Sequence, residues 1–471
     1  MRMIVGGEET GSDEIREVKN PYDGTVIDTV PAATHEHRER AVELALEGLA
    51  QMRSMPAHER GALLLRMSQL LEQRGPETAK LIAMESGKTV REAEVEVARA
   101  VQTFLLSAEE ARRLQGETVP FDAAPGAESK FGYYVREPVG VVLAITPFNF
   151  PLNLPAHKIG PALAAGCSVI FKPASATPLT GLRLGQMLLE CGLPPAALSV
   201  LTGPIEVLGD PLVGDPRIRK VSLTGSDAVG KHVTRVAGLK RLTLELGSNS
   251  AVVIMADADL QAAADRIKIG GYAQAGQVCI SVQRVFVQRP AFQDFLSLME
   301  PLVRGLKAGD QLLEETDVGP MIEERAAIEA EQRIQDAVNE GAELVCGGGR
   351  DGSVLEPAIL TNVPEHNYLS CEEAFAPLIV VSEFQTLEQA IAKVNASRFG
   401  LQAGIYTRDL DTAFEFTRRA EVGGVMVNEV PTFRADLMPY GGVKDSGVGR
   451  EGVKYAIDEV TELKVVVWNL A

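Results

Sequence analysis

The sequence predicts an α/β protein with two parallel-sheet domains and a small β arm. In the middle of the chain, short apolar runs alternate with segments of helical composition, which is the pattern of a doubly wound parallel sheet. A second pattern of the same kind starts near residue 251 and continues to about residue 430. The segments 117–140 and 455–471 are strand-like and fit neither pattern, so we expect them to form a separate arm.

The composition limits the class of protein. The chain has 471 residues, of which 45% are apolar and 23% charged, as expected for two or three globular domains. Its formal net charge of −18 disfavours binding to nucleic acid or to anionic membranes. The five cysteines are widely spaced and form no Cys-x-x-Cys pair, so neither disulfides nor a metal site is predicted. Because no leader peptide and no membrane-spanning run is present, we expect a cytoplasmic protein.

The N-terminal third is expected to be helical after short strands and turns over residues 1–33. Apolar residues recur there at helical spacing in three segments, which are 34–49, 56–74 and 90–114. Four apolar strands of the first sheet follow, at 141–145, 169–171, 198–201 and 221–223.

Polar loops follow three of these four strands, at 146–149, 172–175 and 224–226. The carboxyl ends of parallel strands meet at one edge of the sheet, where such sheets bind ligands. We therefore divide the chain into a cofactor-binding domain (1–116 and 141–247), a catalytic domain (248–435) and oligomerisation strands (117–140 and 455–471). The apolar C-terminal strand would be an exposed edge by itself, which predicts a homodimer or homotetramer.

One cysteine and one glutamate form a chemical pair. Cys279 lies in the run Gly-Gln-Val-Cys-Ile-Ser, and Glu245 lies upstream between two leucines. A thiolate can attack an aldehyde carbonyl and a carboxylate can activate water, so the two together can convert an aldehyde into an acid. Burial between leucines would raise the pKa of Glu245 into a useful range. The remaining cysteines are expected to be buried small residues, namely Cys167, Cys191, Cys346 and Cys371.

A glycine turn predicts a phosphate-binding site. Gly225, Ser226 and Gly230 form a Gly-x₄-Gly pattern before a predicted helix, where backbone N–H groups can approach a pyrophosphate. The pattern lacks the full G-x-G-x-x-G signature of dinucleotide-binding turns and is weak by itself.

Seven segments of the chain occur together in a specific order. They are residues 146–151, 171–174, 223–230, 244–247, 276–279, 372–377 and 438–447. The set resembles the NAD(P)-dependent aldehyde dehydrogenase superfamily from about residue 15 to the end of the chain. The resemblance implies an aldehyde dehydrogenase-like fold, NAD or NADP as cofactor and a cysteine thioester intermediate.

The resemblance also implies roles for individual residues. Cys279 would be the nucleophile, Asn149 an oxyanion donor together with the backbone N–H of Cys279, and Glu245 the base that hydrolyses the thioester. Glu245 favours release of a free carboxylate over transfer to a thiol. The residues implied to line the cofactor site, besides the glycine turn, are Thr146, Pro147, Lys172, Leu246, Glu373 and Phe375.

Two positions depart from the family pattern. NAD-preferring members usually carry glutamate three positions after the family lysine, and this chain has Ser175 there. A carboxylate would repel a 2′-phosphate and serine does not, which leaves the choice between NAD and NADP open. Ser248 stands where the family often has glycine.

His157 and Arg434 occupy positions that line the substrate tunnel in the family. A histidine and an arginine there predict a polar, partly cationic mouth for a small hydroxylated or anionic aldehyde. The segments 246–249 and 430–434 resemble the lactaldehyde and phosphonoacetaldehyde dehydrogenase-like branch. Members acting on phosphonates often have arginine just before the nucleophile, where this chain has Val278, so a doubly charged substrate is disfavoured.

Other functions were weighed against this one. A succinate-semialdehyde dehydrogenase or a non-phosphorylating glyceraldehyde-3-phosphate dehydrogenase is the alternative within the family. A non-catalytic structural homologue is the alternative of another class, and it would be expected to lack Cys279 or Glu245.

Overall fold

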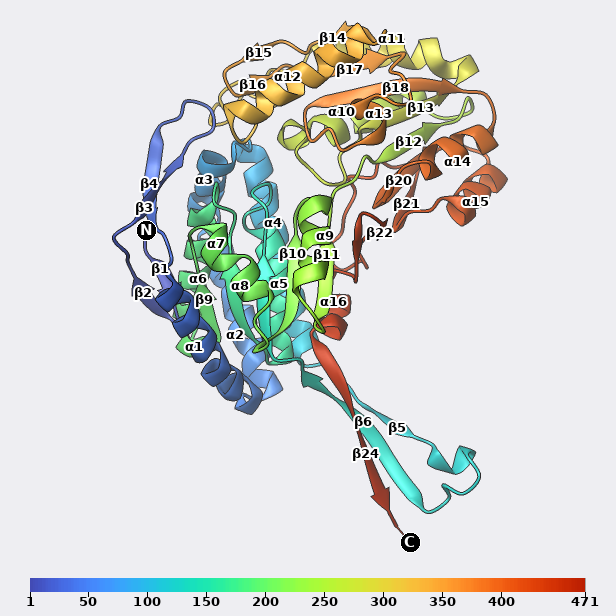
Figure 1. The fold of residues 1–471 in the computed structure, drawn as a ribbon. Coiled ribbons are helices and arrows are strands. Elements are labelled where there is room, and N and C mark those ends of the chain that lie inside the picture. The colour runs from blue at the N-terminus through green and yellow to red at the C-terminus, as the bar shows by residue number, and fades with distance from the viewer. Residues whose placement is uncertain (471) are drawn as a thin grey trace.

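The computed structural model of the chain describes residues 1–470 and is organised around two large sheets and a projecting arm (Figure 1). The first large sheet has eight strands in the order β2-β1-β9-β8-β7-β10-β11-β23. Its strands are β1 (Met3–Val5), β2 (Glu8–Thr10), β7 (Val141–Ile145), β8 (Ser168–Lys172), β9 (Leu198–Val200), β10 (Ile218–Thr224), β11 (Arg241–Glu245) and β23 (Gly447–Val448). The strands β9, β8, β7, β10 and β11 are parallel. Four of them match the apolar runs from which the sequence predicts a parallel sheet, and β11 is an additional strand.

Helices cover both faces of this sheet (Figure 1). They are α1 (His35–Ser54), α2 (Ala57–Gln73), α3 (Gly75–Ser86), α4 (Val90–Ala111), α5 (Asn153–Ala165), α6 (Pro178–Glu190), α7 (Ile205–Leu208), α8 (Asp210–Val213), α9 (Asp227–Val236) and α16 (Val453–Glu459). The hairpin of β3 (Ile15–Lys19) and β4 (Val26–Pro31) lies beside them. Helix α3 is not among the predicted helices. Its Gly-Pro start reads as a break in the sequence, but proline is well suited to the first turn of a helix.

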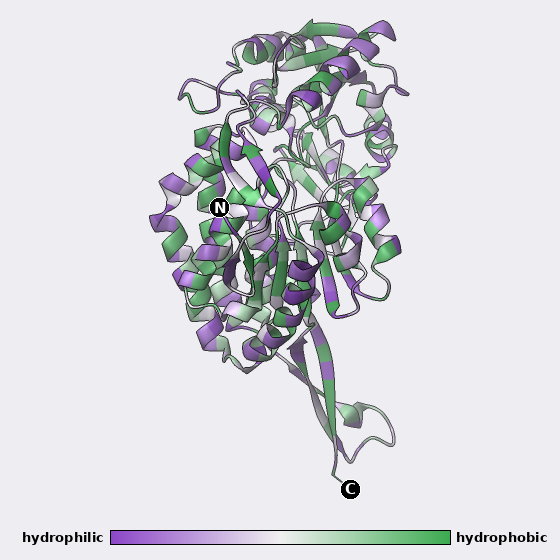
Figure 2. Cartoon of the chain, turned by 60° about the vertical axis from the view of Figure 1, so that its left-hand side comes forward, coloured by the Kyte–Doolittle hydropathy of each residue, from purple (hydrophilic) through white to green (hydrophobic). Residues whose placement is uncertain are grey.

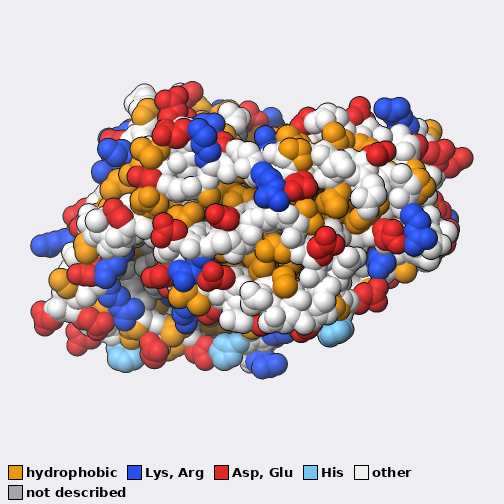
Figure 3. All heavy atoms as spheres, turned by 90° about the horizontal axis from the view of Figure 1, so that it is seen from above, with side chains coloured by type: hydrophobic (Ala, Val, Ile, Leu, Met, Phe, Trp, Pro, Cys, Tyr) orange, Lys and Arg blue, Asp and Glu red, His pale blue; other side chains and the backbone are white. Residues whose placement is uncertain are grey.

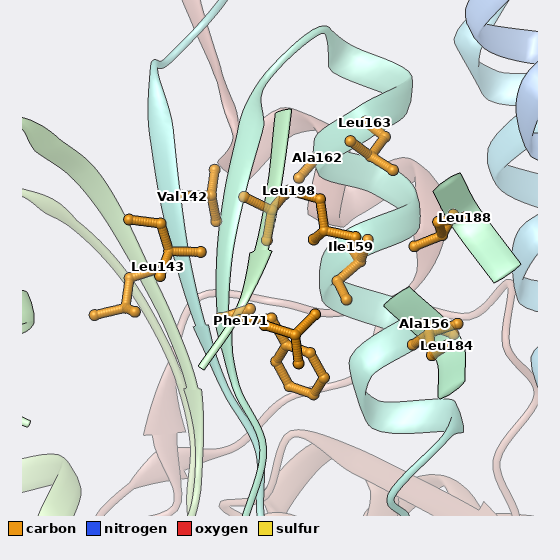
Figure 4. Packing of buried hydrophobic residues seen from close by; sticks show 14 of the residues in the cluster. Val142, Leu143, Ala156, Ile159, Ala162, Leu163, Phe171, Leu184, Leu188 and Leu198 are labelled. Atoms are coloured by element: carbon orange, nitrogen blue, oxygen red, sulfur yellow. The ribbon is translucent and has the colours of Figure 1, made fainter. Parts of the chain in front are cut away.

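The core of this domain lies between the parallel strands and α5 (Figure 4). Val142 and Phe171 of the sheet project toward the helix that carries Ile159 and Leu163, whereas Leu143 projects from the opposite face of the sheet (Figure 4). Every residue of α5 is buried, which is unusual because the helix carries two adjacent polar residues. Burial of such groups requires partners.

The second large sheet has seven strands in the order β14-β17-β18-β13-β12-β20-β21. They are β12 (Ala251–Ile254), β13 (Arg284–Gln288), β14 (Glu343–Cys346), β17 (Ala358–Thr361), β18 (Leu378–Phe384), β20 (Gln402–Tyr406) and β21 (Gly424–Val427). Its helices are α10 (Leu260–Tyr272), α11 (Phe292–Arg304), α12 (Glu324–Asn339), α13 (Tyr368–Cys371), α14 (Leu387–Asn395) and α15 (Leu410–Arg419). Two small two-stranded sheets accompany this sheet. Their strands are β15 (Arg350–Asp351), β16 (Val354–Leu355), β19 (Phe399–Gly400) and β22 (Val443–Lys444).

The arm is a three-stranded antiparallel sheet that extends away from the body (Figure 1). It consists of β5 (Glu117–Val119), β6 (Lys130–Pro138) and β24 (Thr461–Asn469), in the order β24-β6-β5. Strand β24 is therefore an edge strand. Hydrophobic residues recur along it (Figure 2), and most of its apolar side chains are exposed.

The surface over the second large sheet mixes acidic and basic side chains with hydrophobic ones between them (Figure 3). Among residues 1–470, no helix combines the length and apolar character that crossing a bilayer requires.

Candidate active site

Cys279 lies in a turn between α10 and β13, and its side chain is partly exposed. Its Sγ lies 3.0 Å from the Tyr440 hydroxyl oxygen. Burial raises the pKa of the Cys279 thiol to about 11, whereas the hydrogen bond from Tyr440 and the charge of Arg434 act to lower it. Tyr440 and Arg434 therefore favour the ionised form of the thiol, whereas the charges of Glu373 and Glu245 oppose it.

A strained loop holds this cysteine. Gln274 and Ala275 have φ of 50° and 52°, and Gly276 follows at 67°. Left-handed conformations are costly for residues other than glycine, so tertiary contacts must maintain the loop. The Gln274 N–H donates to Glu92 Oε1 of α4 at 2.7 Å. A β-carbon at Gly276 would lie 2.0 Å from the Ala376 carbonyl oxygen, so this close approach requires glycine.

Tyr440 and Arg434 belong to a buried charged cluster. The Arg434 guanidinium lies over the Tyr440 ring, 3.7 Å from its centroid, which is a cation–π geometry. Glu451 pairs with Arg434 at 2.9 Å and with Lys158 Nζ at 2.7 Å. Two cations thus share one carboxylate, and one positive charge remains near the thiol. Arg434 Nε is buried without a hydrogen-bond partner.

Glu245 ends β11 and is buried, with both carboxylate oxygens lacking a partner. Burial raises its pKa well above the ordinary value, and the nearby carboxylate of Glu451 adds to the rise. Gly441 leaves the space beside it open, since a β-carbon there would lie 2.9 Å from Glu245 Oε1. A carboxylate whose pKa is raised in this way is a stronger base than an ordinary carboxylate.

Asn149 follows β7 and reaches the nucleophile loop. Its side-chain amide donates to the Gln277 carbonyl oxygen at 2.8 Å, and its own Oδ1 has no partner. One N–H of the amide is therefore engaged by the loop and the second remains. The Asn149 side chain thus contacts the nucleophile loop two residues before Cys279.

His157 is buried within α5 and is bonded to Asp436, with Nε2 2.8 Å from Oδ1. Asp436 also accepts from Arg99 at 2.8 Å and from Asn153 at 3.1 Å. Burial lowers the pKa of His157, and the charge of Arg434 lowers it further. His157 Nδ1 has no partner, so this nitrogen is the one that remains available.

Glu373 and Phe375 come from the loop before β18. Glu373 Oε1 accepts from the Ser248 N–H at 2.9 Å, and burial raises the pKa of Glu373 to about 8. A β-carbon at Gly247 would lie 2.5 Å from Glu373 Oε2. Phe375 has φ of 49° and packs edge-on against Phe148 with ring centroids 6.0 Å apart.

The glycine turn lies at the start of α9. The Ser226 hydroxyl caps this helix by accepting from the Val229 N–H at 3.4 Å. The Gly225 N–H donates to the Glu245 carbonyl oxygen at 3.0 Å, which ties the turn to the strand of the carboxylate. Gly230 packs closely on Leu246, because a β-carbon there would lie 2.5 Å from the leucine side chain.

Thr146, Pro147, Lys172 and Ser175 complete the predicted cofactor residues. Thr146 is buried, Pro147 is partly exposed and Ser175 is exposed. The Thr146 N–H donates to the Lys172 carbonyl oxygen at 3.4 Å. Lys172 is buried, and among the described residues its ammonium group has no carboxylate partner. A buried cation beside a capped helix start is a donor set that fits an anionic dinucleotide.

Four buried residues of the site were not identified from the sequence, namely Tyr440, Lys158, Asp436 and Glu451. A signal was available for Lys158, because a lysine in a mostly apolar helix requires a buried partner. One expectation about the cysteines is wrong. Cys371 is exposed, whereas Cys167, Cys191 and Cys346 are buried as expected. Among residues 1–470, no group of acidic, histidine and cysteine side chains converges to hold a metal ion.

The sequence matches the model of the aldehyde dehydrogenase family over residues 8–466, and the chain belongs to this family. It is 43% identical over 468 residues to the 3-sulfolactaldehyde dehydrogenase of Priestia aryabhattai, covering 99% of this chain and 98% of the relative. It is 38% identical to the lactaldehyde dehydrogenase of Methanococcus aeolicus, covering 99% of this chain and 100% of the relative.

A solved structure gives the same result. The glyceraldehyde-3-phosphate dehydrogenase of Methanocaldococcus jannaschii, in complex with NADP, superimposes with a TM-score of 0.94 at 36% identity. The alignment covers 97% of this chain and 100% of that chain. The predicted family, fold class and class of oxidoreductase are confirmed.

Proposed function

We propose that the chain oxidises a small hydroxylated or anionic aldehyde to its carboxylate, with NAD or NADP as cofactor. The observation that supports this proposal is the set of side chains around Cys279. Cys279 is partly exposed beside Tyr440, Asn149 reaches its loop, and Glu245 is close enough to influence the pKa of the thiol.

In the first step, the Cys279 thiolate adds to the aldehyde carbon and a C–S bond forms. The carbonyl oxygen becomes an oxyanion, which the free amide N–H of Asn149 and the Cys279 backbone N–H stabilise. A donor of this kind typically contributes about 3–4 kcal/mol. The hydroxyl of Tyr440 donates to the sulfur while it is ionised, and so holds the nucleophile in place.

NAD(P)⁺, when bound, would supply the acceptor for the hydride that leaves the carbon of this adduct. Lys172, Glu373, Phe375 and the glycine turn are the residues that would hold it. Glu245 then accepts a proton from water, the hydroxide attacks the thioester, the C–S bond breaks and the thiolate of Cys279 returns. Burial of Glu245 without a partner keeps its carboxyl group available for this proton.

Charge near the thiol supports the proposed substrate class. Lys158 and Arg434 share Glu451, and the positive charge that remains would attract an anionic or strongly polar tail. Arg434 Nε and His157 Nδ1 are the unpartnered nitrogens that could contact it. The names of both relatives denote small hydroxylated aldehydes, the first of which carries an anionic sulfo group.

A panel of aldehydes assayed with both cofactors tests the proposal. Lactaldehyde, glycolaldehyde, succinic semialdehyde and glyceraldehyde 3-phosphate are expected to give higher kcat/KM than hexanal. A clear preference for hexanal would contradict the substrate roles of His157 and Arg434. The highest value with succinic semialdehyde or glyceraldehyde 3-phosphate would instead select the alternative within the family.

We further infer that β24 pairs with a second subunit, giving a homodimer or homotetramer. An exposed apolar edge strand supports this inference. The absence of disulfides among the five cysteines supports the predicted cytoplasmic location.

A further inference from the structure

We propose that the cofactor site prefers NADP and that Arg16, from the N-terminal hairpin, joins Lys172 in holding the ribose 2′-phosphate. This inference rests on the proposed function, because it concerns the cofactor of the same site. It adds a residue from outside the parallel sheet and decides between the two cofactors.

The strand order places Lys172 at the far end of the cofactor edge. Glu245 ends β11, and the order β11-β10-β7-β8 puts Lys172 at the end of β8, three strands away. At the usual strand spacing this is roughly 14 Å. The glycine turn, which would bind the pyrophosphate, follows β10 between them. A dinucleotide with its reacting end at Cys279 and Glu245 therefore has its other end near Lys172.

Among residues 1–470, Lys172 is a buried cation without a carboxylate partner. It is 92% buried, and the hydrogen bond that the described residues provide is a 3.5 Å contact from Nζ to the neighbouring Pro173 carbonyl. A buried ammonium group is costly unless it is paired. The position three residues on is Ser175, which is exposed and uncharged, so no carboxylate approaches from that side.

Arg16 lies on the inner face of its hairpin. It is opposite Val30 in the antiparallel register, and residues that are paired in this way project to the same face. Val30 and Val18 are both buried in the core of the cofactor domain. Arg16 is therefore on the face of β3 that meets the body, with its side chain 41% exposed, whereas Ile15 on the other face is 64% exposed.

Hydrogen bonds join this hairpin to the ends of β8 and β9. The Thr202 hydroxyl donates to the Pro31 carbonyl oxygen at 2.5 Å, and the Ala33 N–H donates to the Thr202 carbonyl oxygen at 2.7 Å. The Leu201 N–H donates to the Phe171 carbonyl oxygen at 2.9 Å. Ile15 is paired with Pro31, and Arg16 is the next residue along β3. Arg16 therefore lies near the edge of the sheet where β8 ends at Lys172.

The two cations influence each other. Burial lowers the pKa of Lys172, and the charge of Arg16 lowers it further. The carboxylate paired with Arg16 is Glu14, at 3.3 Å, and it is 65% exposed, where an ion pair contributes little. A dianionic phosphate between Arg16 and Lys172 would neutralise both. The 2′-hydroxyl of NAD would leave both charges unmatched.

Binding of NADP⁺ and NAD⁺ to the full-length protein, measured by isothermal titration calorimetry, tests the proposal without catalysis. We expect the wild type to bind NADP⁺ more tightly. Arg16→Ala should weaken NADP⁺ binding by about 10-fold or more, as expected for loss of a charge-assisted hydrogen bond, and should change NAD⁺ binding by less than about twofold. Arg16→Lys should retain most of the preference.

Two further variants sharpen the test. Lys19→Ala removes an exposed cation of the same strand and should leave both affinities unchanged. Ser175→Glu should reverse the preference, because its carboxylate would repel the phosphate. Retained NAD⁺ binding in each variant reports that the fold is intact.

The outcomes separate this inference from the proposed function. Tighter binding of NAD⁺ by the wild type, or an unchanged affinity ratio in Arg16→Ala, would overturn the role of Arg16 while leaving aldehyde oxidation in place. Inorganic phosphate alone binding as tightly as NADP⁺ would also overturn it, because the cation pair would then be a free anion site. If neither NAD⁺ nor NADP⁺ bound, the result would count against the proposed function itself.

Discussion

At the scale of single residues, the Cys279–Tyr440 contact is the central feature. A thiol whose pKa is raised to about 11 by burial is almost entirely protonated at neutral pH, and only the thiolate reacts. The Tyr440 hydroxyl contacts the sulfur directly. The guanidinium of Arg434 lies over the Tyr440 ring. Nucleophile activation therefore depends on a residue outside the predicted catalytic set.

Tyr440→Phe is expected to slow alkylation of Cys279 by iodoacetamide. Loss of a hydrogen bond to the thiolate costs about 1–1.5 kcal/mol, which corresponds to a roughly 5- to 10-fold slower reaction at fixed pH. In both proteins the rate should rise with pH toward about 11, because the thiolate fraction rises. The measurement uses a Cys371→Ala background to remove the other exposed thiol, and Cys279→Ala gives the baseline. Equal rates would show that Tyr440 does not stabilise the thiolate.

Glu245→Gln is expected to separate the two halves of the reaction. The substitution preserves shape but removes the base, so reduced cofactor should form in a burst of about one equivalent per site. Turnover should then fall by roughly 100-fold or more. Rapid mixing with absorbance detection of the reduced cofactor measures both phases. A steady-state rate within twofold of the wild type would remove Glu245 from the mechanism.

The pH dependence of turnover in the wild type tests the same role of Glu245. The deacylation step requires ionised Glu245, whose pKa burial raises. The rate of deacylation should therefore fall as the pH falls through this raised pKa. The amplitude of the burst of reduced cofactor should remain measurable at the same pH.

Sequence alone could identify the residues that the chemistry requires but not the residues that support them. Cys279, Glu245 and Asn149 stand in recognisable segments. Tyr440 is 161 positions from Cys279, and Glu451 is 293 positions from Lys158. These pairs exist only because the chain brings distant segments together, and a single sequence contains no signal for the pairing. His157 and Arg434 were identified, but their buried acidic partners Asp436 and Glu451 were not.

At the scale of elements, the nucleophile loop shows how backbone geometry is maintained. Three successive left-handed residues precede Gln277, and neither Gln274 nor Ala275 has a side chain that favours this conformation. The sequence predicts the parallel strands well, because apolar runs and polar loops mark them directly. It does not predict this loop, because the contacts with Glu92 and Ala376 that hold it are tertiary.

Gly276→Ala is expected to destabilise the protein by about 3–5 kcal/mol and to abolish activity, because its β-carbon would overlap the Ala376 carbonyl. Gly24→Ala is the matched control. Gly24 has a similar φ of 70° but open space around it, so the cost there should be only about 1 kcal/mol. Thermal unfolding of the two variants measures the difference. Similar losses would show that φ alone, and not close approach, makes Gly276 necessary.

At the scale of the whole molecule, the arm has an unpaired strand edge in the monomer. Three apolar side chains of β24 are each more than 50% exposed, namely Leu463, Val465 and Val467. An apolar edge strand of this length tends to pair with a strand of another chain. The sequence predicts this from the apolar C-terminal run alone.

Val465→Lys combined with Val467→Lys is expected to shift the protein toward monomers, because two charges replace the apolar face of β24. Size-exclusion chromatography with light scattering over a range of concentrations measures the shift. Leu239→Lys, at a fully exposed position outside the arm, is the control and should leave the mass unchanged. A wild type that is already monomeric at all concentrations would contradict the role assigned to the arm.

The bond between Gln274 and Glu92 has a mechanical consequence. Glu92 belongs to the first turn of α4 and also closes the capping box of that helix with Thr89, whereas Gln274 belongs to the half of the molecule that carries the sulfur. Separation of the two halves would break this bond and remove a contact that holds the left-handed loop. The geometry of the Cys279 loop therefore depends on the packing of the two halves against each other.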